Sequence, residues 1–125
     1  MASDAYGTDG SGDGPGLTAT LRRRGDVVIV ATAGELDHDS PEPLRRALEE
    51  ALGQDGAERV VVDCTGLMFC DSTGLNILLK GRLDAKAAGT TLELAGLRPP
   101  VARMFEITGA MGLFTVHPEL PQDLA

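Results

Sequence analysis

The N-terminal third of the chain carries two different apolar patterns. Every second residue from Leu17 to Leu21 is apolar, which predicts a strand with one buried face. Residues 27–33 are a continuous apolar run, which is typical of a strand buried on both faces. Gly25 and Asp26 lie between the two and favour a tight turn. We therefore expect an antiparallel hairpin whose second strand is buried.

A helical pattern follows a polar loop that runs from Gly34 to Asp39. Ser40 and Pro41 are the residue types that open a helix, as N-cap and as first helical residue. Apolar residues then recur at helical spacing, at Leu44, Leu48, Ala51 and Leu52. We expect this helix to end at Gly53.

A second buried strand and a second helix come next. Residues 59–64 are rich in Val and predict a buried strand, which the break at residues 65–66 should end. Helical spacing then returns, at Leu75, Leu78, Leu79 and Leu83. Asp71, Ser72 and Thr73 therefore fall where this helix starts.

The last third of the chain predicts a strand, a short helix and another strand. Residues 90–95 alternate after the break at Gly89. Pro99 opens a helix that ends at Gly109, and residues 113–116 form a final strand. The order β-β-α-β-α-β-α-β predicts a single α/β domain with a mixed sheet, an N-terminal antiparallel hairpin and helical crossovers.

The predicted domain covers residues 17–118. Residues 1–16 are rich in Gly, Ser and Asp without a regular apolar period, so we expect a disordered tail. Residues 119–125 are expected to be a short C-terminal tail. With 125 residues, the chain can bury one hydrophobic core and has little length left for a second.

Two polar turns, residues 34–40 and 69–73, each follow a predicted strand and precede a helix. Both should open at the carboxyl edge of the sheet, where sites on such folds gather. Ser72 would lie where the free N–H groups and the dipole of a helix start can hold an anion. Its hydroxyl could cap the helix or accept a phosphate, and the residue types alone favour capping.

Composition and charge narrow the function classes. The formal net charge of −8 opposes nucleic-acid binding, because a phosphate backbone is held by clustered Lys and Arg. No segment has the apolar length of a membrane span, and the N-terminus lacks the basic and apolar parts of a signal peptide, so we expect a cytoplasmic protein. Only 3% of the residues are aromatic, which favours a tight aliphatic core over a ligand cage. Cys64 and Cys70 are predicted to be reduced core residues, in neither a disulfide nor a metal site.

Ser72, His38 and Asp37 are the residue types of a hydrolase triad. No Gly-x-Ser-x-Gly elbow surrounds Ser72, and the side chains of adjacent residues such as Asp37 and His38 rarely point together. We therefore expect no enzymatic activity and no catalytic residues.

Three separated motifs carry a resemblance to a known family. They are Gly-Glu-Leu-Asp at residues 34–37, Val-Val-Val-Asp at residues 60–63 and Phe-Cys-Asp-Ser-Thr-Gly-Leu at residues 69–75. In this order and at these distances they resemble the anti-sigma-factor antagonists, small bacterial proteins built on the STAS domain. The likeness runs from about residue 17 to residue 116. It implies the STAS fold and a phosphorylation-controlled binding function.

In that family the serine that follows the Asp of the third motif is phosphorylated, and it matches Ser72. The resemblance implies a partner that is both an anti-sigma factor and a serine kinase. The unphosphorylated antagonist binds this partner and frees a sigma factor, and a serine phosphatase resets the cycle. Asp37 matches the family's acidic residue near the phosphoacceptor. A phosphate would add about −1.5 to −2 charges beside Asp71, near Asp37 and Asp39, and so oppose binding.

The partner-binding residues expected from the resemblance lie in the two polar turns and in the helix start after the second turn: Glu35, Asp37, His38, Asp39, Asp71, Ser72, Thr73, Gly74 and Asn76. The chain departs from the family at Cys70, where Met or another apolar residue is common, at Thr73, where Ser also occurs, and at Asn76, where Gly is frequent. A STAS-type sensor or scaffold in a larger assembly is the alternative with the same fold. We expect a monomer or at most a weak dimer, with no cofactor and no metal.

Overall fold

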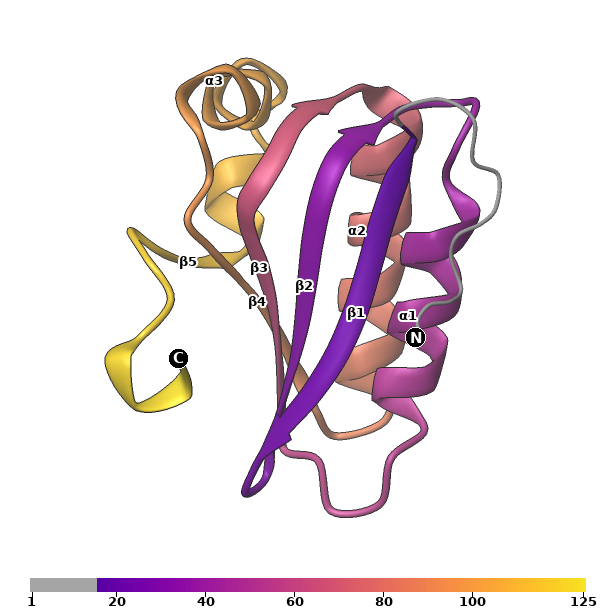
Figure 1. Ribbon diagram of the computed structural model, residues 1–125, viewed down its shortest axis with the longest axis vertical. Coiled ribbons are helices and arrows are strands. Elements are labelled where there is room, and N and C mark those ends of the chain that lie inside the picture. The colour runs from indigo at the N-terminus through magenta and orange to yellow at the C-terminus, as the bar shows by residue number, and fades with distance from the viewer. Residues whose placement is uncertain (1–15) are drawn as a thin grey trace.

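The computed structural model describes residues 16–125 (Figure 1), so all but the last residue of the tail predicted at residues 1–16 lies outside the described residues. Five strands and three α-helices alternate along the chain: β1 (Leu17–Arg24), β2 (Val27–Leu36), α1 (Glu42–Leu52), β3 (Arg59–Cys70), α2 (Ser72–Ala87), β4 (Thr91–Ala95), α3 (Pro99–Thr108) and β5 (Thr115–His117). Two short 3-10 helices complete the described chain, at Ala110–Leu113 and Gln122–Leu124.

The strands form one sheet in the order β1-β2-β3-β4-β5. β1 pairs antiparallel with β2, and every later pair is parallel. Each parallel pair is joined by a helical crossover, as parallel strands require. The predicted α/β fold, with a mixed sheet, an N-terminal antiparallel hairpin and helical crossovers, is therefore confirmed.

The two faces of the sheet bury different residues. α1 and α2 lie on the same face (Figure 1), and the main core forms there around Val28 and Val30 of β2 and Val60 and Val62 of β3. Side chains of a strand alternate between faces, so the neighbouring residues point to the opposite side. We call that side, which faces away from α1 and α2, the far face. Its smaller apolar cluster comprises Val27, Ile29, Val61, Ala95 and Leu124.

The C-terminal segment packs against the far face. Leu124 is only 4% exposed, and Leu120 packs beside it. Residues 119–125, expected to be a tail outside the domain, thus contribute to a hydrophobic cluster in this structure.

β2 and β3 are longer than the sequence predicted. They run to Leu36 and Cys70, whereas we expected ends at residues 33 and 64. The register between them shifts twice, because β3 carries an extra residue opposite residues 31–33 and again opposite residues 34–35. Such bulges let pairing continue past residues that break the apolar pattern. Gly66 sits in the first bulge, where a Cβ would lie 2.8 Å from the Thr32 carbonyl oxygen.

Three smaller boundaries also differ. Pro41 is the N-cap of α1, and Ser40, predicted to cap this helix, instead donates its hydroxyl to Glu35 and Asp37. Leu113 ends a 3-10 helix, so the last strand begins at Thr115. β4 begins at residue 91, one position later than expected.

Candidate functional site at the start of helix α2

Two turns meet at one edge of the sheet because β2 and β3 are parallel neighbours. The turn after β2 leads into α1, and β3 leads directly into α2. Two hydrogen bonds join them: the Asp71 N–H donates to the Leu36 carbonyl (3.1 Å), and the His38 N–H donates to the Asp71 carboxylate (3.2 Å). The predicted meeting of the two turns at the carboxyl edge is confirmed.

Asp71 caps helix α2. Its backbone is extended (φ −101°, ψ −170°), and its Oδ1 accepts the N–H groups of Thr73 (2.9 Å) and Gly74 (3.2 Å). These are two of the donors that a helix start leaves without intrahelical partners. The interpretation of Ser72 as a capping residue is therefore wrong, because Asp71 occupies that position.

Ser72 is the first residue of α2 and is exposed. Among residues 16–125, its hydroxyl has no hydrogen-bond partner within bonding distance. The hydroxyl is therefore accessible on a backbone whose conformation the Asp71 cap defines.

Close packing near Ser72 explains why a glycine stands at position 74. A Cβ at Gly74 would lie 2.6 Å from Cδ2 of Leu36 and 2.9 Å from the Cys70 sulfur, closer than side chains pack. Cys70 is buried beside this contact, and burial together with the neighbouring Asp71 carboxylate raises the pKa of its thiol to about 12. Burial likewise raises the pKa of Cys64 to about 12. Both cysteines are free and buried, as predicted.

The facing turn is ordered mainly by its own hydrogen bonds. Oδ1 of Asp37 accepts the Asp39 N–H (2.9 Å) and the Ser40 hydroxyl (3.2 Å). The Ser40 hydroxyl also lies 3.2 Å from the carbonyl of Glu35, which is half-buried at the end of β2. Asp37 thus organises its own turn, and no hydrogen bond joins it to Ser72 in the described part of the chain.

His38 reaches carboxylates on both sides of the site. Its Nε2 lies 3.3 Å from Asp39 and its Nδ1 lies 3.8 Å from Asp71, and the side chain is 75% exposed. Within residues 16–125 no hydrogen bond or ion pair joins the His38 side chain to Asp37 or Ser72. The geometry of a hydrolase triad is therefore not assembled here.

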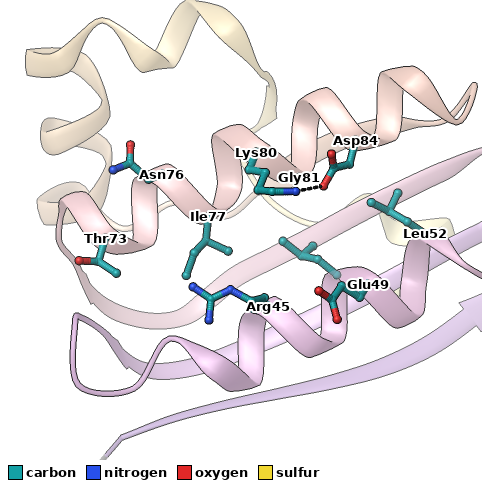
Figure 2. A pocket seen from close by; sticks show the side chains of 10 residues that line it. Arg45, Glu49, Leu52, Thr73, Asn76, Ile77, Lys80, Gly81 and Asp84 are labelled. Carbon is teal, nitrogen blue, oxygen red and sulfur yellow. Dashed lines mark hydrogen bonds and ion pairs between the residues drawn. The ribbon is translucent and has the colours of Figure 1, made fainter.

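Thr73 and Asn76 open onto a groove between α1 and α2 (Figure 2). The groove has a volume of about 330 Å³. α1 contributes Arg45 and Glu49 to its rim, and Lys80 and Asp84 of α2 pair across one turn at 2.8 Å. Two of the residues expected to bind a partner therefore lie along this groove.

Two exposed apolar residues at this edge were not predicted. Met68 is 51% exposed and Phe69 is 48% exposed, just before the capping residue. The signal in the sequence is the run of Leu67, Met68 and Phe69, since three consecutive apolar residues cannot all point to one face of a strand. β3 extends past the last residue of β4 here, so β4 does not pair with this part of β3.

The described residues contain no group of three or more His, Cys, Asp or Glu side chains placed to hold a metal ion. No helix within residues 16–125 has the length and apolarity to cross a membrane.

The family model described as "Mlab, STAS domain" matches residues 19–115. The anti-sigma F factor antagonist of Paenibacillus polymyxa is 32% identical over 101 residues, which are 81% of this chain and 86% of that protein. This chain belongs to the anti-sigma factor antagonist family of STAS-domain proteins. The family is typically non-enzymatic.

Solved structures share the fold of this STAS domain. An anti-sigma factor antagonist from Mycobacterium paratuberculosis superposes with a TM-score of 0.76 at 24% identity, covering 86% of this chain and 91% of that chain. The Bacillus cell fate determinant SpoIIAA in its phosphorylated form gives a TM-score of 0.63 at 20% identity, covering 86% and 95% of the two chains. At these identities, the likeness supports the STAS fold.

Proposed function

We propose that this STAS domain is a switch controlled by phosphorylation of Ser72. In this proposal the unphosphorylated domain binds an anti-sigma factor with serine kinase activity and thereby releases a sigma factor. Transfer of phosphate to Ser72 ends the complex, and a serine phosphatase restores it. We expect the cycle to run in the bacterial cytoplasm, where ATP is available. The observation that carries the proposal is the exposed Ser72 hydroxyl, presented at the first residue of α2 by the Asp71 cap.

The expected partner-binding residues fall into groups with different roles. His38, Asp39, Ser72 and Asn76 are exposed and can contact a partner directly. The remaining expected residues are buried or half-buried and act mainly by shaping the surface: Glu35, Asp37, Asp71, Thr73 and Gly74.

The charge of the phosphate is the proposed basis of the switch. Phosphoserine adds about −1.5 to −2 charges, directly beside the Asp71 carboxylate. The N–H groups of Thr73 and Gly74, which could receive an anion, already donate to Asp71. The new charge would therefore have to be desolvated in the partner interface without those donors. A penalty of about 1.4 kcal/mol lowers affinity tenfold.

A phosphorylation assay tests the site. The domain is incubated with ATP and a candidate anti-sigma kinase, and the modified residue is located by mass spectrometry. We expect one phosphate per chain on Ser72, none on Ser72→Ala, and normal incorporation in the control Thr20→Ala, which removes an exposed hydroxyl from β1. Asp71→Asn should slow the transfer, because the carboxylate next to the acceptor can orient the hydroxyl once the kinase is bound, although no hydrogen bond joins the two in the free domain within residues 16–125. Phosphate on another residue, or equal rates for Asp71→Asn and wild type, would contradict these assignments.

A binding experiment tests the switch itself. Calorimetric titration of the kinase should give at least tenfold weaker binding for Ser72→Asp than for wild type. Ser72→Ala should bind like wild type and stay bound after ATP is added. If Ser72→Asp binds as tightly as wild type, charge at this position is not sufficient for release. A domain that binds no such kinase and takes up no phosphate would instead fit the sensor or scaffold alternative.

A further inference from the structure

The far face of the sheet carries an apolar patch that a short C-terminal segment covers. Val27, Ile29, Val61 and Ala95 come from three adjacent strands, and each is at most 5% exposed. The covering segment, residues 118–125, is here called the C-terminal cover. It lies on the side of the sheet opposite α1 and α2 (Figure 1).

Apolar packing and hydrogen bonds from two arginines hold the C-terminal cover. Leu124 packs on the patch with Leu120 beside it. Two arginines of β1 reach over the sheet: Nη2 of Arg22 donates to the Leu124 carbonyl (2.9 Å), and Nη2 of Arg24 donates to the Ala125 carbonyl (2.6 Å). Two of the three consecutive arginines at the end of β1 thus hold the C-terminal cover.

The patch that the cover hides is complementary to itself. The strand registers place Arg22, Ile29, Val61 and Glu93 in one row across β1, β2, β3 and β4. The row therefore reads basic, apolar, apolar, acidic. A two-fold axis parallel to the strands sets Arg22 of one copy opposite Glu93 of the other and the two apolar residues against each other. Such an isologous contact closes at two subunits.

The Glu93 carboxylate in that row is charged at neutral pH and already pairs with Arg59 of its own chain, so Arg22 of a second copy would join an existing ion pair. Burial would raise its pKa, but hydrogen bonds from Arg59, His117 and Thr91 outweigh burial and lower the pKa to about 2. An uncovered apolar patch between charged rims is a surface that proteins use for association.

We propose that the C-terminal cover keeps this chain monomeric, and that a second copy of the chain takes its place on the far face when the cover lifts. The far face lies on the opposite side of the sheet from α1 and α2. This switch between a covered monomer and a dimer therefore does not depend on phosphorylation of Ser72.

Full-length Leu124→Asp tests the proposal, because a carboxylate cannot stay in an apolar patch without a partner. The control is Leu83→Asp, which makes the same change at a leucine that is 60% exposed on α2. Limited proteolysis reports whether residues 118–125 are released, and sedimentation over a concentration series reports the oligomeric state. We expect early cleavage and a dimer for Leu124→Asp, formed at concentrations at least tenfold below any association of wild type or Leu83→Asp.

Each other outcome overturns part of the proposal. A cover that stays protected in Leu124→Asp would show that Leu124 does not hold it. A released cover with a monomeric domain would show that the far face is not a self-association surface, and large undefined aggregates would exclude the closed two-fold contact. Should circular dichroism show that Leu124→Asp unfolds, Leu124→Ala is measured by the same criteria. Adding Arg22→Glu to Leu124→Asp should weaken the dimer at least tenfold. An unchanged dimer would show that Arg22 of one copy does not lie opposite Glu93 of the other.

Discussion

Helices α1 and α2 begin at the same edge of the sheet but are held in different ways. The start of α2 has a side-chain cap, since Asp71 takes two N–H groups of the first turn. The start of α1 has none: Pro41 is its N-cap, and Pro43 in the first turn removes one N–H that would need a partner. The Ser40 hydroxyl donates to Glu35 and Asp37 in its own turn and does not cap α1.

The two helix starts therefore have different roles in the proposed site. The start of α2 positions the Ser72 hydroxyl, and the turn before α1 supplies exposed side chains that can contact a partner. The α2 start is fixed by its cap and by packing of Gly74 against Leu36, so the Ser72 hydroxyl has a defined place. The exposed His38 and Asp39 belong to the more weakly held turn before α1, which can adjust to a partner. Changes at α2 should therefore cost more stability than changes before α1.

The largest expected loss comes from filling the space at Gly74. Gly74→Ala places a methyl group against Leu36 and Cys70 and should destabilise the domain by about 1–3 kcal/mol. Thermal unfolding followed by circular dichroism measures this. The control is Gly112→Ala, since a Cβ there would meet nothing within 4 Å, and its melting temperature should change little. Equal melting temperatures for the two variants would show that the α2 start is not tightly packed.

Removal of the cap should be the next largest effect. Asp71→Ala leaves the N–H groups of Thr73, Gly74 and His38 without this acceptor and should cost about 1–2 kcal/mol. Asp71→Asn keeps a side-chain oxygen and should cost less than half as much. Denaturant unfolding of the two variants gives the comparison, and equal losses would mean that the carboxylate charge matters more than its role as acceptor.

The same truncation on the α1 side should have a smaller effect. Ser40→Ala removes hydrogen bonds to Glu35 and Asp37 that lie at a half-buried position, and it should cost about 0.5–1 kcal/mol. Denaturant unfolding under the same conditions provides the value. A cost as large as that of Asp71→Ala would remove the contrast between the two helix starts.

Ser72→Asp should have the smallest effect on stability. A carboxylate at a helix start gains about 0.3–1 kcal/mol from the dipole, but repulsion from Asp71 offsets part of this. We expected the added anion to meet unpaired N–H groups; two of them are already bound by Asp71. The melting temperature should stay within a few degrees of wild type. Unfolding of the domain would mean that Ser72 does not occupy an exposed first position of α2.

The sequence predicted which elements exist better than where they end. Apolar periodicity identified the strands and helices, and parallel pairing then required the two polar turns to meet. The extension of β3 to Cys70 was missed because a bulge at Gly66 looks like a strand end in the pattern. The choice between Asp71 and Ser72 as cap was missed because both residue types cap helices equally well.

Contacts between distant segments were beyond what periodicity can predict. Leu124 is buried against Val27 and Ile29, which lie almost a hundred positions earlier in the chain. The carbonyl groups of Leu124 and Ala125 accept hydrogen bonds from arginines of β1, which are equally distant. Local pattern gives no sign of such pairings, and the polar, Pro-containing composition of residues 119–125 favoured a tail.

The strand order has a consequence for the synthesis of the protein on the ribosome. The strands lie in space in the order in which they are synthesised, so each can dock beside the one already made. The apolar patch is complete once Ala95 has been added, while Leu124 follows 29 residues later. At translation rates of about 5–20 residues per second, the last residue of the patch is synthesised roughly 1.5–6 seconds before Leu124, so the patch is made before the residue that covers it.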